Sequence, residues 1–115
     1  MADGTPEPSV DSRLRELRQR ADEDFTTPSV TREPGRHTLE LEEMGMRVSI
    51  TRARYPNRAD GVDQYAVTIS QLRLDHPPEE AQTWRVLTAA FGEAAGEARA
   101  RPSGPAIRMF RVPAG

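Results

Sequence analysis

Cysteine, lysine and long apolar runs are all missing from this 115-residue chain. Without cysteine there can be no disulfide and no thiolate metal site, a composition that suits a reducing compartment. No apolar stretch approaches the roughly 20 residues that span a bilayer. The first residues, "MADGTPEPSVDS", lack the basic and apolar regions of a signal peptide. We therefore expect a cytoplasmic protein that has no membrane partner.

The absence of lysine makes all 16 basic residues arginine, and asparagine occurs only at Asn57. Guanidinium groups suit phosphate and carboxylate recognition. A chain that is also rich in alanine, glycine and proline is, however, typical of a bacterial GC-rich coding sequence, and we favour that explanation. The formal net charge of −2 lacks the basic excess of most nucleic-acid binders.

The first 36 residues differ in composition from the rest of the chain. We predict a tail over 1–8, a short amphipathic helix over about 9–25, and a linker rich in proline and threonine up to residue 36. The apolar stripe of this helix consists of Val10, Leu14, Leu17, Ala21 and Phe25. A helix of this length is marginal alone. Its stripe must therefore pack on the rest of the chain, on a second copy or on a partner.

Three segments after the linker alternate between apolar and polar residues, as half-buried β-strands do: 37–43, 46–55 and 64–74. A short turn that includes Gly45 separates the first two, and the glycine would supply the positive φ that many such turns need. The three segments predict an antiparallel meander.

Hydrophobic pairing predicts the register of this meander. The predicted opposite pairs are Leu41 with Met46, Leu39 with Val48, Ile50 with Ile69, Val48 with Leu72, and Met46 with Leu74. The apolar pattern changes phase between Ile69 and Leu72. A β-bulge near Ser70–Gln71 would keep all of these side chains on one face.

The segment 75–100, "DHPPEEAQTWRVLTAAFGEAAGEARA", predicts the main helix. The residues predicted to form its buried face are Ala81, Trp84, Leu87, Thr88, Phe91, Ala94, Ala95 and Ala98. Gly92 and Gly96 weaken the later turns, so we expect the helix to end between 92 and 99. A last strand over 105–112 is expected at the sheet edge, because arginines interrupt its apolar run.

The predicted fold is a two-layer α+β domain over 37–115, in the order β-β-β-α-β, preceded by the short N-terminal helix. Its three-stranded antiparallel meander is followed by a helix and a fourth edge strand. One helix covers only one sheet face, so the other face stays open. The open face is predicted to carry Arg47, Ser49, Thr51, Ala66 and Thr68.

The order of a helix, three strands and a helix is similar to that of the double-stranded-RNA-binding domain. That family places a basic cluster at the start of its last helix, where it reaches phosphates. The matching stretch here, "PPEEAQTW" (77–84), has two acidic residues and no lysine. The residues that would bind RNA are therefore absent, and we do not assign the chain to that family.

The far end of the hairpin 46–74 combines arginines with tyrosines: Arg52, Arg54, Tyr55, Arg58 and Tyr65. In the predicted register Arg54 lies opposite Tyr65, where its guanidinium can stack on the ring without any ligand. The same group of residues could also contact phosphates and stack a base. Asp60 and Asp63 oppose that positive field, so we favour the structural interpretation.

No residue pattern of an enzyme is present. The chain has no glycine-rich phosphate loop, no nucleophile elbow and no zinc-ligand spacing. Its two histidines, His37 and His76, are far apart in the sequence. We predict no cofactor, no metal and no catalytic residue.

The sequence favours a small binding or adaptor protein that acts through protein–protein contacts, with homodimerisation as one form of them. A core built from about 80 residues is marginal without a partner. The predicted contact residues are Leu14, Leu17 and Ala21 of the N-terminal helix and Arg52, Arg54, Tyr55, Arg58 and Tyr65 of the hairpin. The alternative is a nucleic-acid-binding protein that uses the hairpin arginines.

Overall fold

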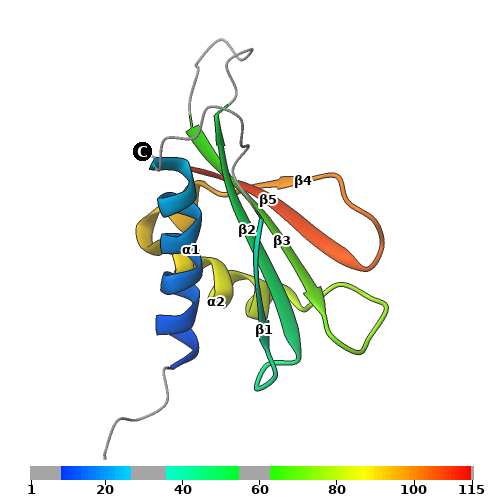
Figure 1. Cartoon of the computed structure of the whole chain (residues 1–115). Coiled ribbons are helices and arrows are strands. Elements are labelled where there is room, and N and C mark those ends of the chain that lie inside the picture. The colour runs from blue at the N-terminus through cyan, green and yellow to red at the C-terminus, as the bar shows by residue number, and fades with distance from the viewer. Residues whose placement is uncertain (1–8, 27–35, 55–62, 115) are drawn as a thin grey trace, which may run out of the picture.

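A computed structural model of the chain describes residues 9–26, 36–54 and 63–114 (Figure 1). The elements are α1 (Val10–Thr26), β1 (His37–Leu41), β2 (Met46–Arg54), β3 (Asp63–Gln71), α2 (Glu80–Phe91), the 3₁₀-helix η1 (Gly92–Glu97), β4 (Arg99–Arg101) and β5 (Ile107–Pro113). The strands form one antiparallel sheet in the order β1-β2-β3-β5-β4. The predicted α+β class and the predicted meander are confirmed.

Both α-helices lie on the same face of the sheet (Figure 1). α1 contacts β1, β2 and α2, and Leu14, Leu17 and Ala21 of its apolar stripe enter the core between the layers. The Phe25 side chain lies outside the described residues. The buried apolar side chains are Leu14, Leu17, Ala21, Leu41, Met46, Val48, Ile50, Tyr65, Val67, Ile69, Val86, Leu87, Ala90, Phe91, Ala95, Phe110 and Val112. Of the helices described, none is long and apolar enough to cross a membrane.

The predicted pairing of the first two strands is confirmed. Leu41 lies opposite Met46 and Leu39 opposite Val48. Gly45 adopts a φ of 63° in the turn between them, a conformation that residues with a Cβ rarely take. The tight turn therefore fixes this register.

The predicted β-bulge between β2 and β3 is wrong. The pairing runs without interruption, with Ile50 opposite Val67 and Val48 opposite Ile69. β3 ends at Gln71, so the two leucines that suggested the bulge lie outside it. The Leu72 N–H donates to the Gly45 carbonyl at 2.9 Å. Leu74 is 52% exposed, and single exposed leucines are common on protein surfaces.

The main helix is shorter than predicted, and its buried face is rotated. α2 ends at Phe91, because Gly92 takes a φ of 60° and the chain continues as η1. The buried residues of α2 are Thr83, Val86, Leu87, Ala90 and Phe91. Ala81, Trp84 and Thr88, which were predicted to be buried, are exposed.

The last strand does not lie at the sheet edge. β5 pairs with β3 on one side and with β4 on the other. The edge strand β4 has three residues, all exposed, and it was not predicted from the sequence. A short, charged edge strand resists pairing with other chains.

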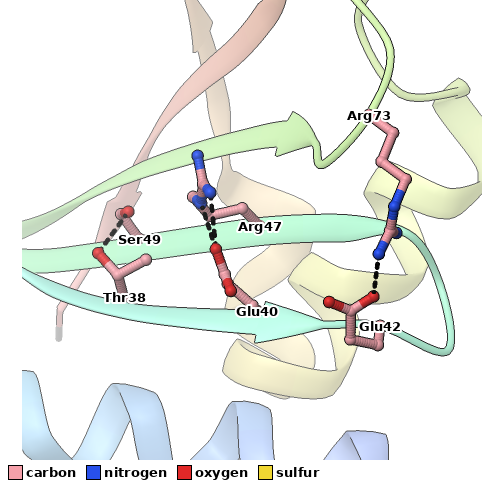
Figure 2. Close-up of polar contacts among 6 residues, drawn as sticks. All are labelled: Thr38, Glu40, Glu42, Arg47, Ser49 and Arg73. Carbon is pink, nitrogen blue, oxygen red and sulfur yellow. Dashed lines mark hydrogen bonds and ion pairs between the residues drawn. The ribbon is translucent and has the colours of Figure 1, made fainter.

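The sheet face opposite the helices carries the residues that were predicted for it. Ser49 lies opposite Thr68, and Thr51 lies opposite Ala66. Figure 2 shows two contacts between β1 and β2 on this face. The Thr38 and Ser49 hydroxyl oxygens are 3.0 Å apart, and the Arg47 Nη2 donates to Glu40 Oε2 at 2.6 Å. No described element covers this face (Figure 1).

Candidate functional site: the groove between the two helices

Three residues that were predicted to contact a partner lie in the protein's own core. The side chains of Leu14, Leu17 and Ala21 are at most 3% exposed. They lie on the side of α1 that faces the sheet, and they fill the space between this helix and the sheet. A partner would therefore meet the other sides of α1, which carry mostly charged residues.

Two of the predicted hairpin residues meet the end of α1. The Tyr65 hydroxyl donates to Asp22 Oδ1 at 2.5 Å, and the Arg52 Nη1 donates to the same oxygen at 3.0 Å. The Arg18 Nε donates to the Tyr65 hydroxyl oxygen at 3.3 Å and lies 3.8 Å from Asp22 Oδ2. We call Arg18, Asp22, Arg52 and Tyr65 the Asp22 cluster.

Aromatic packing holds the Asp22 cluster against α2. The rings of Tyr65 and Phe91 have centroids 5.0 Å apart and are tilted by 51°. The Arg18 guanidinium lies 5.4 Å from the Tyr65 centroid and 5.8 Å from that of Phe91. Contacts of this kind contribute about 0.5–1 kcal/mol at partly exposed sites. The cluster thus joins both helices to β2 and β3.

The corrected register explains which arginine reaches Tyr65. Arg52, not Arg54, lies opposite Tyr65, and Arg54 lies opposite Asp63. Arg52 stacks on the Tyr65 ring at 5.8 Å. The Arg54 side chain and the whole of Tyr55 and Arg58 lie outside the described residues. Of the five predicted hairpin residues, the structure thus brings together Arg52 and Tyr65.

The phenol of Tyr65 makes the free energy of unfolding depend on pH in the alkaline range. Burial, and then the hydrogen bond to Asp22, raise the Tyr65 pKa above its ordinary value of 10.0. The folded protein therefore holds this proton more tightly than the unfolded chain does. The resulting stability is fully present below about pH 10 and is lost as the pH rises through the folded-state pKa. We expect the melting temperature to fall above pH 10, and to fall less steeply in Tyr65→Phe.

Thermal unfolding of both proteins, followed by circular dichroism between about pH 8 and 11.5, measures this difference. Parallel alkaline slopes for the two proteins would contradict the assignment to Tyr65.

Beside the Asp22 cluster, a groove of about 820 Å³ runs between α1 and α2. Its lining includes Arg15, Arg18, Asp22, Trp84, Arg85 and Phe91. Trp84 is 38% exposed, and its ring packs on Phe110 at a centroid distance of 6.1 Å. We call this feature the helix groove. It combines an aromatic wall with arginines from both helices.

The charges of the helix groove do not cancel. Its three arginines face two aspartates, Asp11 and Asp22, and Asp22 already binds Arg52. Within the described part of the chain, no ion pair joins Arg15 or Arg85 to another residue. The groove can therefore accept a negatively charged ligand.

The groove residues were not predicted as a site, for two different reasons. Trp84 was assigned to the core because its spacing matches that of Leu87 and Phe91. Arg15, Arg18 and Arg85 carried no separate signal, because charged residues on an amphipathic helix are the usual solvated face. Tryptophan is rarely fully buried, however, so Trp84 differs from the other residues of the predicted buried face in a way that the sequence shows.

The described side chains contain no group that could hold a metal ion. No group of three or more histidine, aspartate or glutamate side chains in 9–26, 36–54 and 63–114 is placed to hold a metal ion. The Tyr65 hydroxyl belongs to a residue that is only 2% exposed and is engaged by Asp22.

Comparisons of the chain with protein-family models, with curated proteins and with solved structures gave no significant match.

Proposed function

We propose that this protein is a small binding module that takes a segment of a partner protein in the helix groove. The observation that carries the proposal is the partly exposed Trp84 between arginines of two helices. Tryptophan and arginine are among the residues most enriched at the energetic centres of protein interfaces. Few large apolar side chains of the described chain are exposed, and Trp84 is one of them.

The groove favours an acidic, amphipathic helix as the bound segment. Two packed helices form its walls, and a third helix can lie between them with its apolar residues at spacings of three and four. Arg15 and Arg85 would meet the acidic residues of that segment, which steers association and fixes orientation. A second copy of the chain could occupy the groove in place of such a segment, and the experiment below distinguishes the two.

The protein's single tryptophan makes the proposal directly measurable. Peptides selected from a displayed library on the full wild-type chain should be rich in acidic residues and apolar at helical spacing. Their binding should shift the Trp84 emission to shorter wavelength, because the ring leaves water. We expect Trp84→Ala to weaken the selected peptides at least about tenfold.

Leu74→Ala is the matched control, since it removes an exposed apolar side chain outside the groove. It should leave peptide affinity unchanged. Selection of peptides that bind Trp84→Ala equally well would contradict the proposal. Light scattering would instead identify a second copy as the occupant if the molar mass of the wild type rises with concentration and that of Trp84→Ala does not.

A further inference from the structure

The open sheet face has one neutralised end and one positively charged end. At the β1–β2 end, both Arg47 Nε and Nη2 donate to Glu40 Oε2, at 3.1 and 2.6 Å, as Figure 2 shows. At the β5–β4 end, the strands carry Arg99, Arg101 and Arg111. The face is thus locally basic at one end, while the whole chain has a net charge of −2.

The strand register places the three arginines of the β5–β4 end on the same side. Arg99 lies opposite Arg111, and Arg101 lies opposite Met109. Ala100 lies opposite the buried Phe110, so its two neighbours in β4 point away from the helices. η1 lies on the helix side, since its Ala95 is in the core. The arginines therefore share the uncovered face.

The two arginines of β4 carry the positive charge that a ligand would meet first. Arg99 and Arg101 are exposed, and neither forms an ion pair with another described residue. A bound anion would accept charge-assisted hydrogen bonds from Arg99 and Arg101.

Small hydroxyl residues continue from the arginines across the sheet. One row runs through Thr38, Ser49, Thr68 and Met109 to Arg101, and crosses all five strands. At about 4.8 Å between neighbouring strands, this row is about 19 Å long. Serine, threonine and arginine are side chains that bind phosphate oxygens in nucleic-acid complexes. The face is therefore long enough for several consecutive phosphates.

We infer that the β5–β4 end of the open face binds the phosphate backbone of a single-stranded nucleic acid. The guanidinium fork matches phosphate geometry, and the face has a local charge opposite to that of the ligand. A strand laid across the sheet would contact Thr38 and Thr68 and then, past Met109, the arginines. Ser49 is only 8% exposed, and its hydroxyl already pairs with Thr38. The described residues of this face include no aromatic side chain, so affinity comes from phosphates with little sequence preference.

A protein partner fits this face less well than a nucleic acid does. Stable protein interfaces need a desolvated aromatic or large apolar centre, and serine and threonine rarely provide binding energy there. The centre of this face is Ser49, Thr51, Ala66 and Thr68. The inference is independent of the helix groove, which lies on the opposite side of the sheet.

Fluorescence anisotropy of labelled DNA and RNA strands of about 20 nucleotides, and of the matching duplexes, tests the inference between about 25 and 200 mM salt. The full chain should bind both single strands at low salt, and more tightly than the duplexes. Arg99→Gln with Arg101→Gln should weaken binding at least about tenfold. Loss of two phosphate contacts should reduce the slope of log affinity against log salt by about 1.4.

Arg20→Gln with Arg73→Gln is the control, because it removes the same charge from exposed side chains away from β4. It should change affinity less than about threefold, and Trp84→Ala should not change it at all. Equal weakening by the two double variants, or no binding at low salt, would overturn the inference. Equally tight, arginine-dependent binding of polyglutamate would also overturn it, in favour of an acidic protein.

Discussion

Replacing Leu14 with alanine should lower the free energy of unfolding by about 3 kcal/mol, within the range for leucine in a well-packed core. Leu14 is fully buried between α1 and the sheet. In a domain of this size such a loss lowers the melting temperature by roughly 10–20 °C. The effect is large because α1 supplies the core with Leu14, Leu17 and Ala21, although its residues precede the sheet in the chain.

Leu74→Ala provides the same chemical change at a leucine that is 52% exposed. Surface substitutions of this kind usually change stability by less than about 0.5 kcal/mol. Urea denaturation of the two variants, with light scattering to record the oligomeric state, separates the alternatives. Equal stability of the two variants would mean that α1 does not pack as described. A change of mass in Leu14→Ala, without loss of stability, would mean that the stripe binds a second copy.

The register of β1 and β2 could be predicted from the sequence, whereas that of β2 and β3 could not. A short turn with a positive-φ glycine leaves the first pair one arrangement that buries its apolar residues. Between β2 and β3 the prediction relied on Leu72 and Leu74 facing the core. Exposed leucines are common on protein surfaces, so this premise was weak. The wrong register placed Arg54 opposite Tyr65, whereas the structure places Arg52 there.

The buried face of α2 shows a second limit of sequence patterns. The apolar residues of 80–98 extend around more than one side of a helix, and periodicity does not choose between neighbouring sides. The choice depends on α1, which packs beside α2. Burial of Val86 and Ala90 turns Trp84 toward the solvent edge. The candidate groove therefore follows from tertiary packing that no single helix encodes.

The Asp22 cluster depends on the same tertiary packing. Asp22 and Tyr65 are 43 positions apart in the sequence, and neither is unusual in its own segment. Arg52 and Tyr65 were selected as candidates for their residue types, but their acidic partner on α1 was not predicted. A contact between a helix and a strand on opposite sides of a linker leaves no periodic signal.

Replacing Asp22 with alanine should lower the free energy of unfolding by about 2 kcal/mol, since hydrogen bonds to charged groups contribute about 1.5–3 kcal/mol each. The change removes the acceptor of the Tyr65 hydroxyl and the carboxylate that binds Arg52. The Asp22 and Arg52 side chains are 31% and 19% exposed, so water screens part of that value. Glu16→Ala removes an exposed acid on the same helix, paired with Arg20, and should cost about 0.5 kcal/mol or less. Urea denaturation of both variants measures the difference.

A double-mutant cycle that combines Asp22→Ala with Tyr65→Phe isolates the hydrogen bond between the two residues. Tyr65→Phe keeps the ring that packs on Phe91 and removes only the hydroxyl. If the bond stabilises the fold, the second substitution should cost less when the first is present, with a coupling of about 1 kcal/mol. Additive losses would mean that Asp22 acts through the arginines alone. In that case the melting temperature of Asp22→Ala would fall above pH 10 as steeply as that of the wild type, because burial alone would raise the Tyr65 pKa.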